Sequence, residues 1–295
     1  MRAAENRLRT SWRRRIVSCR IAVAKQDGRI VREPKSQVAA PSHRFAKGAA
    51  ALMMGQIGRG GTMAFEHRYD RNKQALSDRE CQALSECKVA VIGCGGLGGY
   101  VAEHLARVGV GTLRLVDADV FEESNINRQL FCTENVLGRV KVEVAGERLA
   151  KVNPEVQVET LNTLLTSDNA FDLIGGCQCA VDCLDNVAAR FQLARACQEA
   201  GIPVVYGAIA GWFGQVCTVF PGDVSFVTLY GAYEDSNDGE GAQKAEGNLP
   251  FTAGAIASFQ AAEAVKVLLG RQDVLRNRLL MVDLLFGSVE EMTLR

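Results

Sequence analysis

The sequence predicts an α/β protein built on a doubly wound, mainly parallel sheet. Between residues 88 and 269, apolar runs of strand length alternate with amphipathic runs of helix length, which is typical of parallel sheets. A glycine-rich turn joins the first strand-like run to the first helical run. Two strand-like runs then close the chain with no helix between them, and they predict an antiparallel extension near the C-terminus.

The individual elements follow from local patterns. Residues 88–92 read as an apolar strand, and residues 97–107 as a helix that Gly109 and Gly111 end. The helix at 140–151 has apolar side chains at helical spacing and closes at Asn153-Pro154. Further strands are expected at 112–116, 156–161, 180–183, 203–208, 215–220, 279–284 and 288–294, further helices at 187–200 and 251–269, and a long polar loop at 231–250.

Composition is that of an ordinary globular protein. Of the 295 residues, 47% are hydrophobic and 23% are charged, and no apolar run reaches transmembrane length, so we expect no membrane association. The ten cysteines form no Cys-x-x-Cys pair, and several lie in apolar, strand-like runs. We therefore expect reduced core thiols and a cytoplasmic protein.

Charge divides the chain into two parts. Residues 1–62 contain 14 Lys and Arg but only 3 Asp and Glu. The remaining residues contain 20 Lys and Arg and 31 Asp and Glu, since the whole chain has 34 of each kind. The basic part lacks a clean hydrophobic period, so we expect it to be disordered or an over-extended start, although its composition also suits an organellar transit peptide. The folded domain is expected to span 63–295, and its acidic balance argues against a nucleic-acid partner.

A nucleotide-binding turn lies between the first strand and the first helix. Gly93, Gly95, Gly96 and Gly98 fit the pattern G-x-G-x-x-G in the strand–turn–helix context that gives this motif its meaning. Glycines let backbone N–H groups approach a phosphate at the helix N-terminus. Asp117 ends the next strand, where a carboxylate can accept ribose hydroxyls. These residues alone would also fit a Rossmann-like NAD or flavin site.

Three charged residues further along favour phosphate chemistry. Arg128 and Lys141 can flank one phosphate group, and Asp185 follows a buried strand at the edge where open α/β sheets bind ligands. A hydride-transfer site needs neither paired cations nor a magnesium-seeking carboxylate, whereas a nucleotidyl-transfer site needs both. Each residue also has a structural interpretation: a surface salt bridge for Arg128, a solvated helix position for Lys141 and a helix N-cap for Asp185.

Residues 65–270 resemble the ubiquitin-activating-enzyme-like adenylyltransferases of bacteria, the MoeB/ThiF/HesA group. The matching blocks occur in the order and spacing of that family, and they are RYDRN, VIGCGGLGG, LVDADVFEESNINRQ, GRVKVE, DCLDNVAAR, PVVYGAIAGWFGQV and SFQAAEAVKVLLG. The resemblance implies a doubly wound, Rossmann-like ATP-binding domain. It also implies that Mg²⁺ and ATP activate the C-terminal glycine of a small ubiquitin-like sulfur-carrier protein that ends in Gly-Gly.

The resemblance also assigns roles to residues. It implies that Asn125, Arg128 and Lys141 brace the phosphates and that Asp185 binds magnesium. Arg71 resembles an arginine that reaches the neighbouring protomer's site, so the family pattern implies a homodimer. The remaining nucleotide-binding positions implied are Gly93, Gly95, Gly96, Gly98, Asp117, Ser124, Asn127 and Asn186.

The sequence departs from the family at its cysteines. Many relatives bind structural zinc through two Cys-x-x-Cys pairs, but residues 218–295 contain no cysteine, so we expect no zinc site. Some relatives place a cysteine before the long helix for covalent chemistry with the carrier. Here residues 241–254 read GAQKAEGNLPFTAG, so we expect adenylylation without a thioester or persulfide step on this chain.

Three other functions fit parts of the sequence. An enzyme that activates a carboxylate on modified tRNA adenosine and dehydrates it would share the motifs, but the acidic domain disfavours it. An NAD-type oxidoreductase lacks a catalytic histidine, since no histidine follows His104. A non-catalytic scaffold that binds a nucleotide or a ubiquitin-like protein would not need Arg128, Lys141 and Asp185 together.

The basic segment should be dispensable. A chain that starts at Met63 should fold and adenylylate as well as the full chain, because residues 1–62 carry no core pattern and the family resemblance begins only after them. Soluble yield, urea unfolding and carrier-dependent exchange of pyrophosphate into ATP would be compared for the two chains. Lower activity or solubility of the shorter chain would place the segment within the domain.

Overall fold

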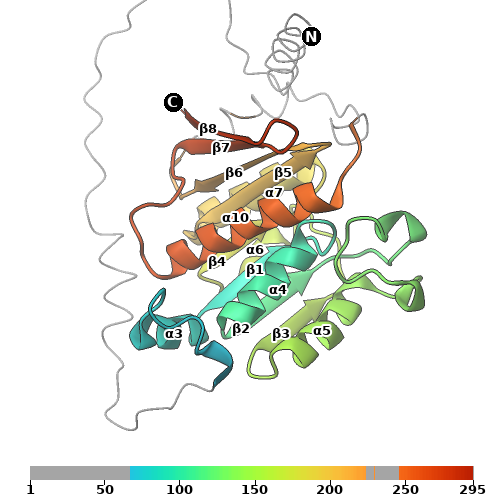
Figure 1. The fold of residues 1–295 in the computed structure, drawn as a ribbon, viewed down its shortest axis with the longest axis horizontal. Coiled ribbons are helices and arrows are strands. Elements are labelled where there is room, and N and C mark those ends of the chain that lie inside the picture. Colours follow the sequence, from blue (N-terminus) through green and yellow to red (C-terminus); the bar gives the residue numbers. More distant parts are fainter. Residues whose placement is uncertain (1–66, 224–228, 230–245, 295) are drawn as a thin grey trace, which may run out of the picture. The chain divides into compact units, whose positions relative to one another are not determined.

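The computed structural model describes residues 67–223, 229 and 246–294 (Figure 1). The basic segment 1–62 and most of the loop expected at 231–250 lie outside the described residues. The described residues 67–294 form one mixed sheet of eight strands in the order β3-β2-β1-β4-β5-β6-β7-β8. None of the helices in the described part of the chain is long and apolar enough to cross a bilayer.

The sheet is parallel in its first half and antiparallel in its second, as the sequence predicts. Five strands pair in parallel, and the last three pair antiparallel beyond β5. The parallel strands are β1 (Lys88–Ile92), β2 (Thr112–Val116), β3 (Gln157–Leu161), β4 (Cys179–Asp182) and β5 (Val204–Ala210), and the added strands are β6 (Phe213–Val219), β7 (Arg278–Asp283) and β8 (Ser288–Thr293).

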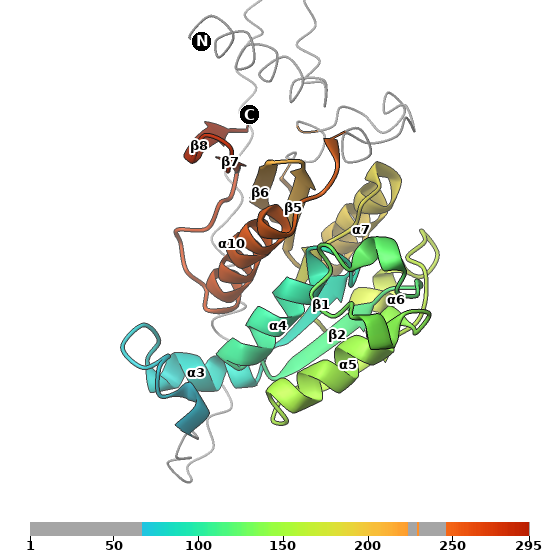
Figure 2. The ribbon, with the colours of Figure 1, turned by 45° about the vertical axis from the view of Figure 1, so that its right-hand side comes forward.

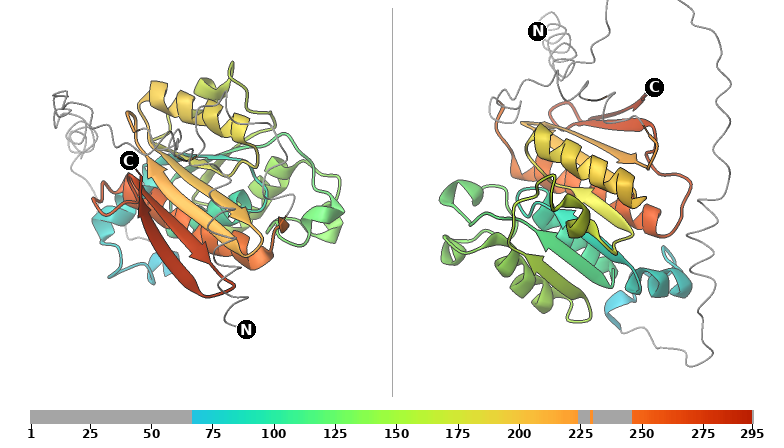
Figure 3. Two further views of the ribbon diagram at one scale, coloured as in Figure 1. Left: turned by 90° about the horizontal axis from the view of Figure 1, so that it is seen from above. Right: turned by 180° about the vertical axis from the view of Figure 1, so that it is seen from behind.

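Helices cover both faces of the sheet. One face carries α4 (Gly98–Val108), α5 (Lys141–Val152) and α10 (Pro250–Leu268), which pack on a continuous apolar core (Figures 1 and 2). The opposite face carries α6 (Ala170–Ile174) and α7 (Val187–Ala200) on a second apolar cluster (Figure 3, right). The central strands β1, β4 and β5 are largely buried between these layers, so they read as continuous apolar runs.

Strand order places a crevice at the end of β1. The chain runs outward from β1 through β2 to β3, and β4 then returns to the other side of β1. Connections therefore leave β1 and β4 in opposite directions. In open α/β sheets, the carboxyl edge of such a switch point is where ligands bind.

Two helices were not predicted. Helix α3 (Asp78–Ser85) precedes β1 and begins with a capping box, in which Ser77 and Glu80 each accept the other's backbone N–H. The pattern Ser-x-x-Glu is a recognised helix-start signal and could have revealed it. Helix α6 has five residues, too few for a clear period. The described residues also contain three short 3₁₀ helices: η1 (His67–Tyr69), η2 (Glu123–Asn125) and η3 (Glu134–Val136).

A buried carboxylate fixes α10 against the antiparallel strands. Glu263 is buried, and its Oε2 atom accepts hydrogen bonds from Thr218 Oγ1 on β6 at 2.7 Å and from the Leu275 N–H at 2.7 Å. Lys266 forms an ion pair with its other oxygen. The polar contacts of Glu263 thus join α10, β6 and the segment before β7.

Loss of one of these bonds should weaken the fold measurably. Thr218→Val keeps the side-chain shape but leaves Glu263 with one donor fewer, so the free energy of unfolding should fall by about 1–3 kcal/mol in urea titrations. Thr160→Val on β3 is the control, because Thr160 is exposed, and its effect should stay within about 0.5 kcal/mol. Equal stability of the two variants would contradict the role of this bond.

Candidate functional site

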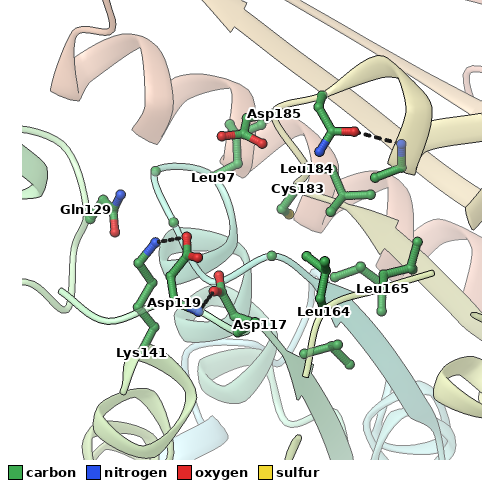
Figure 4. A pocket seen from close by; sticks show the side chains of 18 of the residues that line it. Leu97, Asp117, Asp119, Gln129, Lys141, Leu164, Leu165, Cys183, Leu184 and Asp185 are labelled. Atoms are coloured by element: carbon green, nitrogen blue, oxygen red, sulfur yellow. Dashed lines mark hydrogen bonds and ion pairs between the residues drawn. The ribbon is translucent and has the colours of Figure 1, made fainter. Parts of the chain in front are cut away.

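A cleft of about 350 Å³ opens at the carboxyl ends of β1, β2 and β4 (Figure 4). It lies at the switch point of the sheet. Eight of the residues that the sequence marked as site residues line it: Gly93, Gly95, Gly96, Asp117, Arg128, Lys141, Asp185 and Asn186. Gly98, Ser124, Asn125, Asn127 and Arg71 do not line the cleft.

Close packing explains the glycines of the turn. Gly93 has φ +93°, and a Cβ atom there would lie 2.7 Å from the carbonyl oxygen of Cys183, at the end of β4. A Cβ on Gly98 would lie 1.8 Å from the Gly93 carbonyl oxygen. Gly98 therefore closes the turn rather than lining the cleft. Its absence from the lining agrees with the general role of the third glycine in this motif.

Asp117 anchors the glycine turn to β2. Its Oδ2 atom accepts the Cys94 N–H at 2.6 Å, and its Oδ1 atom accepts the Asp119 N–H at 2.8 Å. The carboxylate still lines the cleft, where the sequence places a ribose. Since a carboxylate oxygen can accept more than one hydrogen bond, the anchoring role leaves capacity for a ligand hydroxyl.

Lys141 is a buried cation rather than a solvated helix residue. It is the first residue of α5 and is 6% exposed. Its Nζ atom donates to Asp119 Oδ2 at 2.8 Å, and its backbone N–H donates to the Asp119 carbonyl at 3.0 Å (Figure 4). The interpretation as a solvated surface lysine is therefore wrong. Asp119 was not among the predicted residues, although it lies two residues after Asp117.

Arg128 lies on the loop that follows η2. Its Nη1 atom donates to the Ser124 carbonyl and to Asn127 Oδ1, each at 2.9 Å. Within the described residues it forms no ion pair, so the surface salt-bridge interpretation does not hold there. Asn125 shapes the same loop, because its Oδ1 atom accepts the Glu122 N–H at 3.1 Å. Ser124, Asn125 and Asn127 thus support Arg128 from outside the cleft.

Asp185 faces the cleft from the other side. Figure 4 shows it across the opening from Lys141 and Asp119. The N-cap of α7 is Asn186, whose Oδ1 atom accepts the Ala189 N–H at 2.7 Å, so the N-cap interpretation of Asp185 is wrong. The Asp185 side chain is exposed and has no hydrogen bond or ion pair with any described residue.

Arg71 is far from this cleft in the fold. It is exposed in the turn between η1 and α3, and α3 leads into the amino end of β1. The cleft lies at the opposite, carboxyl end of that strand, where Ile92 and Gly93 line it. Arg71 therefore does not contribute to the cleft of its own chain.

The cleft also contains residues that sequence reasoning missed. Apolar residues in its lining are Ile92, Leu164, Leu165, Leu184 and Ala189, of which Leu164, Leu165 and Leu184 lie on one side of the cleft (Figure 4). Leu164 and Leu165 follow β3, so their position after a strand was the available signal. Gln129 and Asn248 line the polar part, and each has a buried side-chain oxygen without a partner in the described structure. No sequence signal marks Asn248, since it comes from a distant segment.

The thiols near the cleft are poor nucleophiles. Burial raises the pKa of Cys94 and of Cys183 well above the ordinary thiol value, and the nearby Asp117 and Asp182 carboxylates act in the same direction. All nine described cysteines are buried and unbridged, as expected for core residues. Because the thiolate is the nucleophile, these cysteines are unsuited to covalent chemistry. No group of three metal-binding side chains occurs among the described residues.

Comparisons with known proteins identify the family of this chain. The model of the ThiF family matches residues 69–295. The SAMP-activating enzyme E1 of Haloferax volcanii is 36% identical over 212 residues, which are 72% of this chain and 78% of that protein. The molybdopterin-synthase adenylyltransferase of Escherichia coli (strain K12) is 34% identical over 218 residues, 72% of this chain and 85% of that protein.

Solved structures share the fold. PaaA superimposes with a TM-score of 0.64 at 22% identity, over 85% of this chain and 81% of that chain. E. coli MccB with ATP superimposes with a TM-score of 0.62 at 21% identity, over 79% of this chain and 72% of that chain. The chain belongs to the ThiF family. The family that the motifs indicate, and the Rossmann-like fold expected with it, are thus confirmed.

The adjacent glycines Gly98 and Gly99 offer a test of the turn. Gly98→Ala should destabilise the protein by about 1–3 kcal/mol and weaken ATP binding, because its Cβ would overlap the Gly93 carbonyl. Gly99→Ala is the matched control, since its Cβ would meet the nearest side chain at an ordinary 3.5 Å. Urea unfolding and calorimetric ATP titration would measure both. Similar losses in the two variants would show that the contact is not decisive.

Proposed function

We propose that this chain adenylylates the C-terminal glycine carboxylate of a small ubiquitin-like sulfur-carrier protein, using ATP and Mg²⁺. The observation that carries the proposal is the division of the cleft. Leu164, Leu165 and Leu184 lie on one side of the cleft, and Lys141 with Asp119 lies on the other (Figure 4); Arg128 and the glycine turn also line the cleft. An adenine base fits the first side and a triphosphate fits the second. The names of the adenylyltransferase and E1 relatives support the same chemistry.

In the proposed reaction, a carboxylate oxygen of the carrier attacks the α-phosphorus of ATP. The bond from that phosphorus to the oxygen bridging the α- and β-phosphates breaks, and pyrophosphate leaves with its electron pair. Attack by an anion on a polyanion is opposed by like charge, so preorganised cations are the main catalytic requirement. Lys141 meets this requirement well, because its charge is held in place and shielded from water.

Lys141 can bind a phosphate oxygen while it keeps its contact with Asp119. In the structure, its ammonium group donates to Asp119, whose side chain is 70% exposed. An ammonium group has three N–H donors, so it can keep Asp119 while it donates to a phosphate oxygen. We infer that Asp119 holds the lysine in position before and during nucleotide binding.

Asp185 fits a magnesium ligand by its chemistry. It offers a free carboxylate to the cleft, and hard cations such as Mg²⁺ take carboxylate and phosphate oxygens while keeping several waters. A bound Mg²⁺ would neutralise charge on the phosphates and on the leaving pyrophosphate. The chain's own task is to hold Asp185 and Asn186 at the cleft edge.

The proposed assembly is a homodimer. Arg71 is exposed and lies at the amino edge of the sheet, so it is available to a neighbouring protomer but not to its own cleft. We propose that it completes the partner's site. The adenylate is expected to leave for a separate acceptor, because the described cysteines have raised pKa values. Their reduced, buried state suits the cytoplasm.

Removal of the cations should affect rate more than binding. Lys141→Ala and Arg128→Ala should each lower carrier-dependent exchange of labelled pyrophosphate into ATP by about 10²–10³-fold, while ATP affinity falls much less. The reason is that the charge they stabilise grows only in the transition state. Calorimetric titration with ATP gives the binding side of the comparison.

Arg139→Ala is the matched control for these variants. Arg139 lies two residues before Lys141, is exposed and pairs with Glu147. Its replacement by alanine therefore removes one positive charge at a position outside the cleft lining. Exchange should remain near the wild-type rate. If Lys141→Ala and Arg128→Ala also keep normal exchange with a carrier that the wild type accepts, the adenylylation mechanism is wrong and a scaffold role gains support.

A further inference from the structure

A second charged pair lies directly behind the cleft, and the proposed chemistry does not use it. Asp182, the last residue of β4, is 0% exposed, and Arg190, in the first turn of α7, is 2% exposed. Arg190 Nη1 donates to Asp182 Oδ2 at 3.1 Å. Burial raises the pKa of the Asp182 carboxyl, and the guanidinium opposes this rise. Burying two charges costs several kcal/mol per ion, so stability alone is a weak reason for this pair.

The pair holds both backbone polar groups of Leu184. Asp182 Oδ1 accepts the Leu184 N–H at 3.0 Å, and Arg190 Nη2 donates to the Leu184 carbonyl. Arg190 Nη1 also donates to the Gly207 carbonyl on β5 at 2.8 Å. The carbonyl of Asp182 accepts Gln260 Nε2 from α10 at 2.8 Å. The residue before Asp185 is therefore fixed to two strands and a helix.

Asp185 itself depends on this support. Its side chain makes no hydrogen bond or ion pair with another described residue, so nothing holds the carboxylate directly. On its C-terminal side, Asn186 is fixed as the N-cap of α7. On its N-terminal side, Leu184 is fixed by the Asp182–Arg190 pair. The direction of the carboxylate follows from these two neighbours.

We propose that Asp182 and Arg190 are positioning residues that hold Asp185 in the orientation needed to bind the Mg²⁺ of the ATP complex. This inference rests on the proposed function, because it assumes that Asp185 meets a metal. A positioning role and a purely structural role predict different effects on the Mg²⁺ requirement. A pair that only joins α7 to β5 would change stability when removed, but it would leave the Mg²⁺ requirement unchanged.

The test replaces the pair as a unit. Asp182→Val/Arg190→Met removes both charges together and leaves no unpaired buried ion, so the protein should fold. Arg190→Lys is a second variant, since it keeps the charge but loses the planar group that reaches three acceptors. The matched control is Glu103→Met/Arg148→Met, which removes another buried carboxylate and one of its two arginine partners between α4 and α5, outside the cleft; the remaining partner, Arg107, is exposed.

Two measurements need no carrier protein. Calorimetric ATP titrations at a series of Mg²⁺ concentrations give the Mg²⁺ concentration for half-maximal binding. We expect this concentration to rise about 10- to 100-fold in the double variant, as for other losses of support behind a metal ligand. Arg190→Lys should shift it in the same direction. Hydrogen exchange of the Leu184 amide, measured without ATP or metal, should accelerate in both variants and stay unchanged in the control.

Exchange of pyrophosphate into ATP with the carrier separates this inference from the proposed function. If the wild type shows no exchange, the proposed function fails, while the Mg²⁺ titrations still test the pair. A folded double variant with the wild-type Mg²⁺ requirement would overturn the inference. If the double variant does not fold, an unchanged Mg²⁺ requirement in Arg190→Lys overturns it equally. An equal shift in the Glu103/Arg148 control would also overturn it.

Discussion

The contact of three strand ends with one glycine turn is the constraint on which the rest of the structure depends. The Gly93 N–H donates to the carbonyl of Val116 at 2.8 Å, at the end of β2, and Gly93 lies against the Cys183 carbonyl beyond β4. Asp117 then holds the next amide of the turn. Because β1, β2 and β4 are fixed by this packing, the residues that follow them lie around a single cleft.

The charged residues in and behind this cleft differ in how deeply they are buried. Lys141 is buried with an exposed partner in Asp119, which suits a cation that also meets phosphate. The Asp182–Arg190 pair is buried with fixed partners, which suits support of a neighbouring backbone. Asp185 is exposed and unpartnered in the described structure, which suits a ligand for an incoming cation. The three carboxylates differ in environment, and the environment separates their proposed roles.

Sequence reasoning succeeded where a local pattern was long or chemically distinct. Strands β1 and β2 and helix α7 have the predicted bounds, and the other predicted elements shift by a residue or two at their ends. It failed for α6, which is too short to show a period, and for α3, whose capping box was overlooked. Of the predicted residues, Gly93, Gly95, Gly96, Asp117, Arg128, Lys141, Asp185 and Asn186 line the cleft, whereas the lining residues Asp119, Gln129 and Asn248 were not predicted. The missed side chains become significant only through contacts with distant residues.

The sequence by itself determined the order of strands and helices, the glycine turn and the family, because these depend on spacing along the chain. The tertiary structure decided which of those residues meet. It made Lys141 a buried ion-paired cation, assigned the cap of α7 to Asn186 instead of Asp185, and placed Arg71 at the opposite edge of the sheet from the cleft. The physical reason is that burial, charge pairing and hydrogen-bond partners are set by which strand ends adjoin, and parallel strand order is a long-range property.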